Sequence, residues 1–313
     1  MFEIKRYEPL HEQAWNDFVA RSKNGTFLFD RRFMDYHSDR FADSSLMILR
    51  KGRIYALLPA NRVGDTLHSH QGLTYGGLLT DAKATAEGVM EAFGALNAWL
   101  RNEGVRRVTY KAMPWIYHRL PAEEDLYALT QVCHARLLTR EISSTILLQQ
   151  PLRFTESRKS GLRKALREGL YMEESGDLAA FWQMLDDNLA SRHHTHPVHS
   201  LDELRLLQGR FPQQIHLYLI YNKEKEPVGG TWVFDTGQVV HTQYIASTEE
   251  GKAHGALDLL FDELINRRYR EGIYLDFGKS TEEGGRVLNE HLIFQKEGFG
   301  GRGVCYDTYE WEP

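Results

Sequence analysis

Hydrophobic and polar residues follow the same succession of patterns twice along the chain. In each half, three stretches with strand-like alternation precede a long segment whose apolar residues recur at helical spacing. The predicted strands are 45–50, 53–63 and 66–77 in the first half, and 215–221, 227–235 and 239–247 in the second. The predicted long helices, 85–102 and 254–270, stop close to Gly104 and Gly272. Glycine is the residue type that tolerates the left-handed C-terminal cap of a helix.

Each long helix is followed by a strand, a second helix and a last strand. These segments are 105–113, 122–134 and 136–149 in the first half, and 273–278, 284–299 and 303–311 in the second. Equivalent landmarks keep an almost constant offset, because Tyr75 to Tyr244 is 169 residues and Gly104 to Gly272 is 168. A constant offset is what a tandem duplication predicts. The alternative is that unrelated α/β proteins share this order of elements.

We therefore predict two domains, residues 1–150 and 151–313. A chain of 313 residues is long enough for about two cores. The second half carries an insertion before its three meandering strands, and this insertion begins with a predicted basic helix at 155–169. No Pro/Gly/Ser-rich linker separates the halves. We expect them to pack together and to form a ligand cleft between them.

Composition narrows the class of protein. The hydrophobic fraction of 42% and the charged fraction of 26% are typical of folded globular proteins. No run of 18 apolar residues and no signal-peptide pattern is present, and the two cysteines are isolated. These features favour a cytoplasmic protein without a membrane span. The net charge of -5 argues against a DNA-binding protein.

Two polar segments could contact a substrate. On a helix, Lys159, Arg163 and Arg167 share one face. Such a row of cations can bind a phosphate or carboxylate group, and the alternative is that it is a solvated helix face. The segment 193–199 holds four histidines, but Pro197 breaks the helix that would align them, and no cysteine completes a zinc set. We predict no metal site, and we leave His196 either in a substrate-contacting loop or in a plain surface loop.

The stretch 247–256 joins a predicted strand to a predicted helix. Gly251, Lys252 and Gly255 lie there, and amide groups at a helix N-terminus favour anions. Glu249 and Glu250 place negative charge beside this loop. We keep the three residues as candidates for binding a cofactor phosphate, the alternative being an ordinary strand–helix turn.

Further candidates lie on the strands of the second half and at the C-terminus. Asp276 interrupts an apolar strand, Asn289 precedes a helix, and Lys296 lies in the last turn of that helix, where it also complements the helix dipole. A general base near an attacking amine would come from His241, Tyr244 or Asp276. In the first half His70 and Tyr75 lie in the segment 66–77, where they line a cleft or belong to a β-bulge.

The order SRKSGLRKALREG, QYIAS, long helix, YLDFG and FQKEGFGG resembles the second domain of Fem-type peptidyltransferases, which are tandem GNAT-fold acyltransferases. The resemblance implies an α/β architecture of two GNAT-like folds, each with a mixed sheet flanked by helices. In these enzymes a lysine in the motif matched by Lys296 stabilises charge on the donor or intermediate. Basic-helix residues hold the precursor, and Arg163 and Arg167 occupy that region here.

The resemblance implies an acyltransferase that moves an aminoacyl or acyl group onto an amine of a cell-envelope precursor or related metabolite. The donor would be aminoacyl-tRNA or acyl-CoA, with no tightly bound cofactor, and the acceptor a small or peptide-like molecule. An acetyl-CoA-dependent N-acetyltransferase is the first alternative. A non-catalytic ligand-binding protein is the second.

Overall fold

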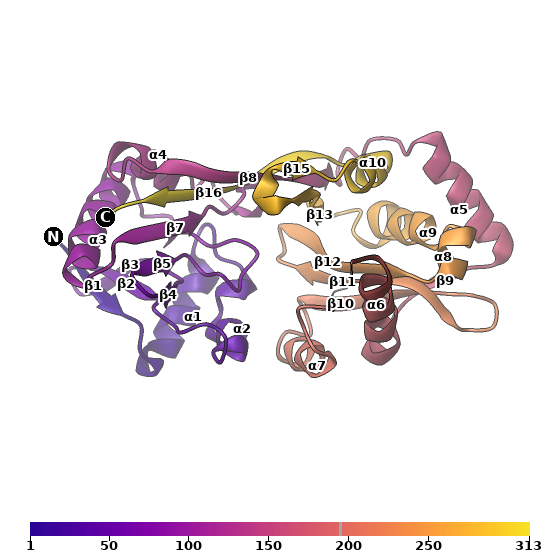
Figure 1. Ribbon diagram of the computed structural model, residues 1–313, viewed down its shortest axis with the longest axis horizontal. Coiled ribbons are helices and arrows are strands. Elements are labelled where there is room, and N and C mark those ends of the chain that lie inside the picture. Colours follow the sequence, from indigo (N-terminus) through magenta and orange to yellow (C-terminus); the bar gives the residue numbers. More distant parts are fainter. Residues whose placement is uncertain (194–195) are drawn as a thin grey trace. The chain divides into compact units, whose positions relative to one another are not determined.

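The computed structural model describes residues 1–193 and 196–313 (Figure 1). The chain forms two compact units that exchange segments. The first unit contains 1–141, 281–287 and 305–313, and the second contains 142–280 and 288–304. The division therefore differs from the predicted boundary at 150/151. The reason is that the strands β8 (Arg136–Leu147) and β16 (Arg302–Trp311) each contribute residues to both units.

The first unit contains two groups of strands. One is an antiparallel sheet in the order β1-β2-β3-β6, formed by Phe2–Arg6, Leu46–Arg50, Arg53–Leu58 and Leu79–Thr80. The other has the order β4-β5-β7-β16, in which β4, β5 and β7 are Asn61–Val63, Thr66–His68 and Arg107–Lys111. Its helices are α1 (Glu12–Arg21), α2 (Arg31–Met34), α3 (Ala86–Asn102) and α4 (Glu124–Gln131).

The core of the first unit forms around α3. The helix begins after Thr85, whose side chain accepts a hydrogen bond from the amide of Gly88, as a capping residue should. Its buried residues, Val89, Ala92, Phe93, Leu96 and Leu100, pack on Trp311 and on the strands. The predicted helix 85–102 is confirmed, because α3 has nearly the same bounds and buries the predicted apolar stripe.

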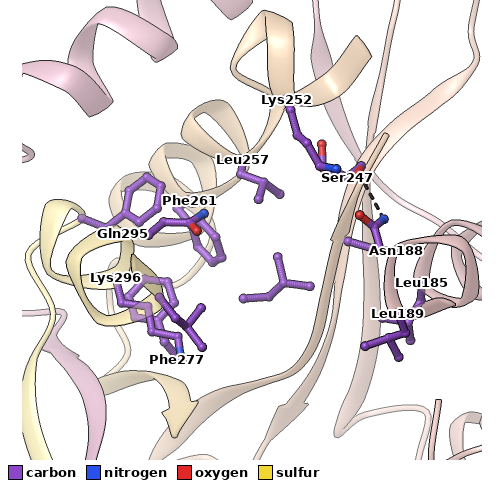
Figure 2. Close-up of a pocket in the computed structure, with 14 residues that line it drawn as sticks. Leu185, Asn188, Leu189, Ser247, Lys252, Leu257, Phe261, Phe277, Gln295 and Lys296 are labelled. Atoms are coloured by element: carbon purple, nitrogen blue, oxygen red, sulfur yellow. Dashed lines mark hydrogen bonds between the residues drawn. The ribbon is translucent and has the colours of Figure 1, made fainter. Parts of the chain in front are cut away.

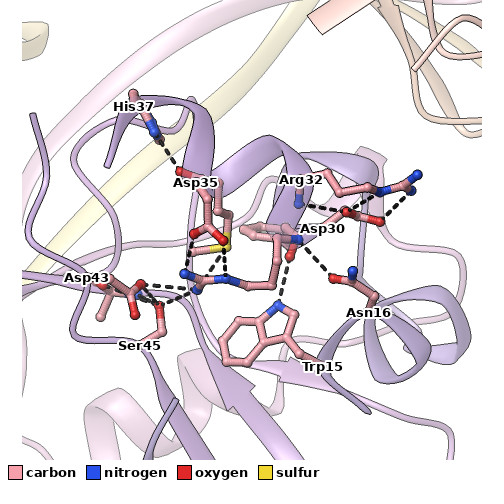
Figure 3. Close-up of polar contacts among 12 residues, drawn as sticks. Trp15, Asn16, Asp30, Arg32, Asp35, His37, Asp43 and Ser45 are labelled. Atoms are coloured by element: carbon pink, nitrogen blue, oxygen red, sulfur yellow. Dashed lines mark hydrogen bonds and ion pairs between the residues drawn. The ribbon is translucent and has the colours of Figure 1, made fainter. Parts of the chain in front are cut away.

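A buried arginine fixes the short helix α2. Arg31 is only 3% exposed, and its guanidinium donates to Asp35 and, over 3.1 Å, to Asp43 (Figure 3). It also lies 3.9 Å from the centroid of the Tyr7 ring. The Asp30 carboxylate caps the helix, since it accepts from the amide of Arg32 over 2.9 Å. The helix is short because a 3-10 turn at Asp35–His37 follows it.

The second unit is built on a sheet in the order β8-β13-β12-β11-β10-β9. The strands β9 to β13 are Tyr171–Glu174, Ile215–Tyr221, Pro227–Asp235, Val239–Ser247 and Tyr274–Lys279. All neighbours are antiparallel except β12 and β13, which are parallel. The short strands β14 (Thr281–Glu282) and β15 (Val287–Leu288) form a separate ribbon.

Helices cover this sheet on both faces (Figure 1). They are α5 (Glu156–Glu168), α6 (Leu178–His193), α7 (Leu201–Arg210), α8 (Glu249–His254), α9 (Ala256–Glu263) and α10 (Glu290–Gly298). The core of this unit forms where α9 packs against β10 and β11. The apolar stripe consists of Leu260 and Phe261 of α9 and of Leu264 and Ile265, which lie in a π-helical extension of that helix. No described helix has the length and hydrophobicity needed to span a membrane.

Two predicted helices of the second half differ from the structure. The predicted helix 254–270 begins at Ala256 as α9, because Gly255 adopts a left-handed conformation with φ of 79°. This glycine ends a separate helix, α8, which lies in the stretch 247–256 that was predicted to join a strand to a helix. The predicted helix 284–299 begins only at Glu290, after the Asn289 side chain accepts from the amide of Leu292 over 3.0 Å.

Candidate functional site

The parallel strands β12 and β13 separate in the middle of the second unit. They pair only from Val239 to His241 on β12. Beyond that point β13 turns at Gly278, which has φ of 74°, whereas β12 continues along β11 to Ser247. A β-bulge helps to direct β12 away, because Gln243 is an extra residue between the pairs Val233–Thr242 and Trp232–Tyr244.

A cavity of ≈ 330 Å³ lies where the two strands diverge. Figure 2 shows Lys296 and Phe277 on one side of it and Leu185, Asn188 and Leu189 of α6 on the other. Its apolar lining consists of Leu185, Leu189, Ile245, Ala246, Leu257, Phe261, Phe277, Leu292 and Phe299. Its polar lining consists of Asn188, Ser247, Lys252, Gln295 and Lys296. A mainly apolar pocket with a few polar groups is the usual form of a small-molecule site.

Lys296 is the buried cation of this cavity. It is 5% exposed, and its Nζ donates to the carbonyl oxygens of Gly278 over 2.8 Å and Lys279 over 2.9 Å. Burial lowers the pKa of Lys296 to about 8, while the nearby Asp276 carboxylate acts in the opposite direction. Near neutral pH the cavity therefore holds a positive charge in an apolar setting, where it interacts strongly with developing negative charge.

Asp276 and His241 form a buried pair next to Lys296. Asp276 is fully buried, and one carboxylate oxygen accepts from the hydroxyls of Ser143 over 2.5 Å and Thr145 over 2.9 Å. Its other oxygen lies 2.9 Å from His241 Nδ1. The parallel register places Asp276 opposite His241, as the prediction of adjacent strands required. The arrangement fixes the orientation of the imidazole ring.

Tyr244 takes part in a different contact. Its hydroxyl lies 2.6 Å from His199 Nδ1, and its ring stacks on Trp232. Burial raises the pKa of Tyr244 to about 12, so the hydroxyl stays protonated near neutral pH. Tyr244 does not line the cavity. Of the three predicted base candidates, the structure thus brings together His241 and Asp276, and it places Tyr244 apart from them.

The phosphate-loop candidates have structural roles around α8. The Gly251 amide donates to Thr248 Oγ1 over 3.0 Å, and a Cβ at this position would lie 1.9 Å from the carbonyl oxygen of Val228. A Cβ at Gly255 would lie 2.4 Å from the carbonyl oxygen of Gly161 on α5. Lys252 lines the cavity and forms an ion pair with Glu249. Packing therefore accounts for both glycines, and Lys252 is the member of this group that reaches the cavity.

The remaining predicted residues lie outside the cavity. Arg163 is exposed and pairs with Glu156 over 2.6 Å, and Arg167 is exposed on the same helix. His196 is exposed, 2.7 Å from Asp186, while the neighbouring His194 of the histidine segment lies outside the described residues. In the part of the chain that the structure describes, no cluster of three His, Cys, Asp or Glu residues could hold a metal ion.

His70 and Tyr75 lie inside the first unit and not in this cavity. The Tyr75 hydroxyl donates to Thr26 Oγ1 over 3.2 Å, and its ring is fully buried. The His70 ring stacks on His37 at 5.3 Å between centroids, and burial lowers the pKa of His70 to about 3. Neither residue is among those that line this cavity, and a substrate contact of His70 or Tyr75 stays a prediction.

Sequence reasoning missed two sets of residues. Leu185, Asn188 and Leu189 of α6 form one wall of the cavity, and Ser143 and Thr145 of β8 hold Asp276. A signal for the second set was present, because Ser143 and Thr145 occupy alternate positions of the predicted strand 136–149 and therefore lie on one face of it.

Comparisons with known proteins agree with this geometry. Residues 155–284 match the family described as Acetyltransferase (GNAT) domain. No curated protein sequence matches the chain. Among solved structures, that of FemX has a TM-score of 0.68 at 11% identity and covers 99% of this chain and 97% of that one. The structure of L-PGS from Bacillus licheniformis has a TM-score of 0.62 at 13% identity, with 97% and 92% covered.

A tandem GNAT protein from the clavulanic acid biosynthesis pathway has a TM-score of 0.51 at 12% identity, covering 100% of this chain and 98% of that one. Residues 155–284 thus match the GNAT domain family, and the chain as a whole has the tandem GNAT fold seen in the FemX structure. The predicted tandem GNAT fold is confirmed, and the family match over residues 155–284 agrees with the predicted acyltransferase class.

Proposed function

We propose that the second unit transfers an aminoacyl or acyl group onto an amine, with the donor's acyl end in the cavity between β12 and β13. The observation that carries this proposal is the position of Lys296, a buried cation in an otherwise mainly apolar pocket of a GNAT domain. When an amine attacks an ester or thioester carbonyl, negative charge develops on the carbonyl oxygen. A preorganised cation in a dry site stabilises that charge.

The charge around α8 favours an aminoacyl ester donor over a CoA thioester. Glu249 and Glu250 lie in the first turn of α8, and Thr248 already accepts from the amide of Gly251. A pyrophosphate at this helix end would meet two carboxylates and compete for an amide that is already bonded. An aminoacyl-tRNA donor needs no pyrophosphate there. The proposed acceptor is an amine on a cell-envelope precursor or a related metabolite.

An acyl-CoA donor is the second candidate, because Lys252 lies at the cavity and offers one cation near the same loop. The two donors are separated by calorimetric titration with CoA and acetyl-CoA, followed by transfer assays with radiolabelled acetyl-CoA and with radiolabelled aminoacyl-tRNA. Transfer from aminoacyl-tRNA without micromolar CoA binding supports the first candidate. Saturable CoA binding and acetyl transfer would replace it by the second, and transfer from neither donor to a panel of amines would contradict the proposed function.

A further inference from the structure

A second groove, of ≈ 860 Å³, lies in the first unit. It is lined by α1, by the turn between β2 and β3, and by the segment that leads into α3. Its lining holds five cationic side chains, namely Arg21, Arg50, Lys51, Arg53 and Lys83, against two carboxylates, Asp17 and Asp81. The chain as a whole carries a net charge of -5, so this excess of positive charge is local.

The hairpin concentrates three of these cations. Lys51 and Gly52 have φ of 52° and 73°, so the turn has two left-handed residues, as tight hairpins of right-handed twist require. Arg50 and Arg53 are cross-strand partners on either side of this turn. Like charges directly opposite each other destabilise an antiparallel pair. A bound anion would remove this repulsion.

The cations are available to such an anion. Within residues 1–193 and 196–313, Lys51, Arg53 and Lys83 are exposed and form no ion pair with a carboxylate. Arg21 lies with its guanidinium 4.7 Å from the centroid of the Phe18 ring. Arg50 approaches Glu91 only at 3.9 Å. The protein therefore neutralises the positive charge of the groove only in part.

The two carboxylates restrict what kind of anion fits. Asp17 accepts from Gln13 over 2.7 Å, and Asp81 accepts from the amide of Lys83 over 2.9 Å. Both retain acceptor capacity, since an ionised carboxylate accepts about four hydrogen bonds. They would repel a ligand made only of phosphate, but they would accept from hydroxyl groups beside the phosphates. Tyr55 adds a half-buried aromatic ring.

We propose that this groove binds a small phosphorylated ligand that carries hydroxyl groups, of the nucleoside diphosphate class. Arg53, Lys83 and their neighbours hold the phosphates, and Asp17 and Asp81 accept from the sugar hydroxyls. An RNA backbone is disfavoured because it would present phosphates along the groove to the two carboxylates. The site belongs to the first unit and shares no lining residue with the cavity of the proposed transfer reaction.

The test is calorimetric titration of the full chain with ADP and with inorganic pyrophosphate at low salt. We expect both to bind saturably and ADP to bind more tightly. The double variant Arg53→Ala/Lys83→Ala should weaken both by about tenfold or more, since charge-assisted hydrogen bonds are lost. The control variant Lys5→Ala/Arg205→Ala removes the same charge from exposed positions outside the groove and should bind both probes as the parent does.

A second variant separates the hydroxyl contacts from the phosphate contacts. Asp17→Asn/Asp81→Asn keeps the side-chain oxygens that accept from Gln13 and from the Lys83 amide, but it removes two negative charges. It should strengthen pyrophosphate binding and reduce the preference for ADP. The proposal is overturned if neither probe binds at millimolar concentration, or if ADP binds equally well to Arg53→Ala/Lys83→Ala. Binding of mixed tRNA that depends on Arg53 and Lys83, without binding of ADP, would also overturn it in favour of an RNA surface.

Discussion

Lys296 donates a hydrogen bond of 2.8 Å from its Nζ to the carbonyl oxygen of Gly278, two residues beyond Asp276 on the same strand. The turn at Gly278 therefore joins the buried cation to the buried pair of Asp276 and His241. A Cβ at Gly278 would lie 3.3 Å from His241 Cε1, so the backbone of the turn also packs against the imidazole ring. The cation, the turn and the imidazole are thus one connected assembly.

Replacing Lys296 by methionine should abolish transfer while leaving the fold intact. Methionine fills the apolar part of the site but supplies no positive charge. We expect kcat/KM to fall by roughly 100-fold or more, the cost of losing one oxyanion-stabilising donor. The measurement is steady-state transfer with whichever donor, aminoacyl-tRNA or acetyl-CoA, supports transfer by the parent protein, together with a thermal melt. The control is Lys164→Met on the exposed face of α5, and equal activity of the two variants would contradict the role of Lys296.

The stability of the protein should rise with pH across the titration of Lys296. The folded pKa is about 8, whereas an unfolded lysine titrates near 10.5. Below pH 8 both states hold the proton and the cost of burying the cation is fully present. Between pH 8 and 10.5 the unfolded state holds more protons, so the free energy of unfolding increases, in total by about 3 kcal/mol.

Urea unfolding at several pH values measures this effect. The quantity to compare is the free energy of unfolding of the parent minus that of Lys296→Met, because other titrating groups cancel in the difference. We expect the difference to grow in favour of the parent from pH 8 to pH 10.5. Two parallel curves would show that Lys296 is not buried as a cation.

The Asp276→Asn variant should move the pH dependence of transfer. Asp276 raises the pKa of Lys296, so its charge delays the loss of the ammonium proton. Asparagine keeps an oxygen that accepts from Ser143 and Thr145, but it carries no charge. We expect the decline of kcat/KM above about pH 8 to begin at lower pH in this variant. Asp235→Asn, at the β11 turn, is the matched control, and a profile identical to that of the parent would disprove the coupling.

The sequence predicts the fold well where one pattern and its caps agree. The helix 85–102 is predicted from its apolar stripe and from Gly104 at its end, and α3, which Thr85 caps in the structure, follows these boundaries. The prediction 254–270 contains α9 but missed α8 and the break at Gly255 that ends it, since a glycine-containing stretch between a strand and a helix is equally compatible with a loop. The break is fixed by the close approach of Gly161, which is a tertiary contact.

In the site, too, the tertiary contacts could not be predicted from local sequence patterns. His241 and Asp276 were placed on adjacent strands by the order of elements, and their contact follows from the register. The separation of Tyr244 from this pair could not be predicted, because the Tyr244 hydroxyl forms a hydrogen bond with His199, which is distant in the sequence. The α6 wall of the cavity was also missed, because nothing local in Leu185 or Asn188 indicates which strand the helix covers.

Alanine at Gly255 should destabilise the protein and disturb the mouth of the cavity. The residue has φ of 79°, which alone costs about 1–2 kcal/mol for a side chain, and the added Cβ would lie 2.4 Å from the Gly161 carbonyl oxygen. We expect a loss of more than about 2 kcal/mol by urea unfolding, since backbone atoms must move. The matched control is Gly94→Ala inside α3, where a Cβ meets nothing within 4 Å and should stabilise by about 0.5–1 kcal/mol. Equal effects of the two substitutions would mean that α8 and α9 do not need the left-handed junction that places Lys252 at the cavity.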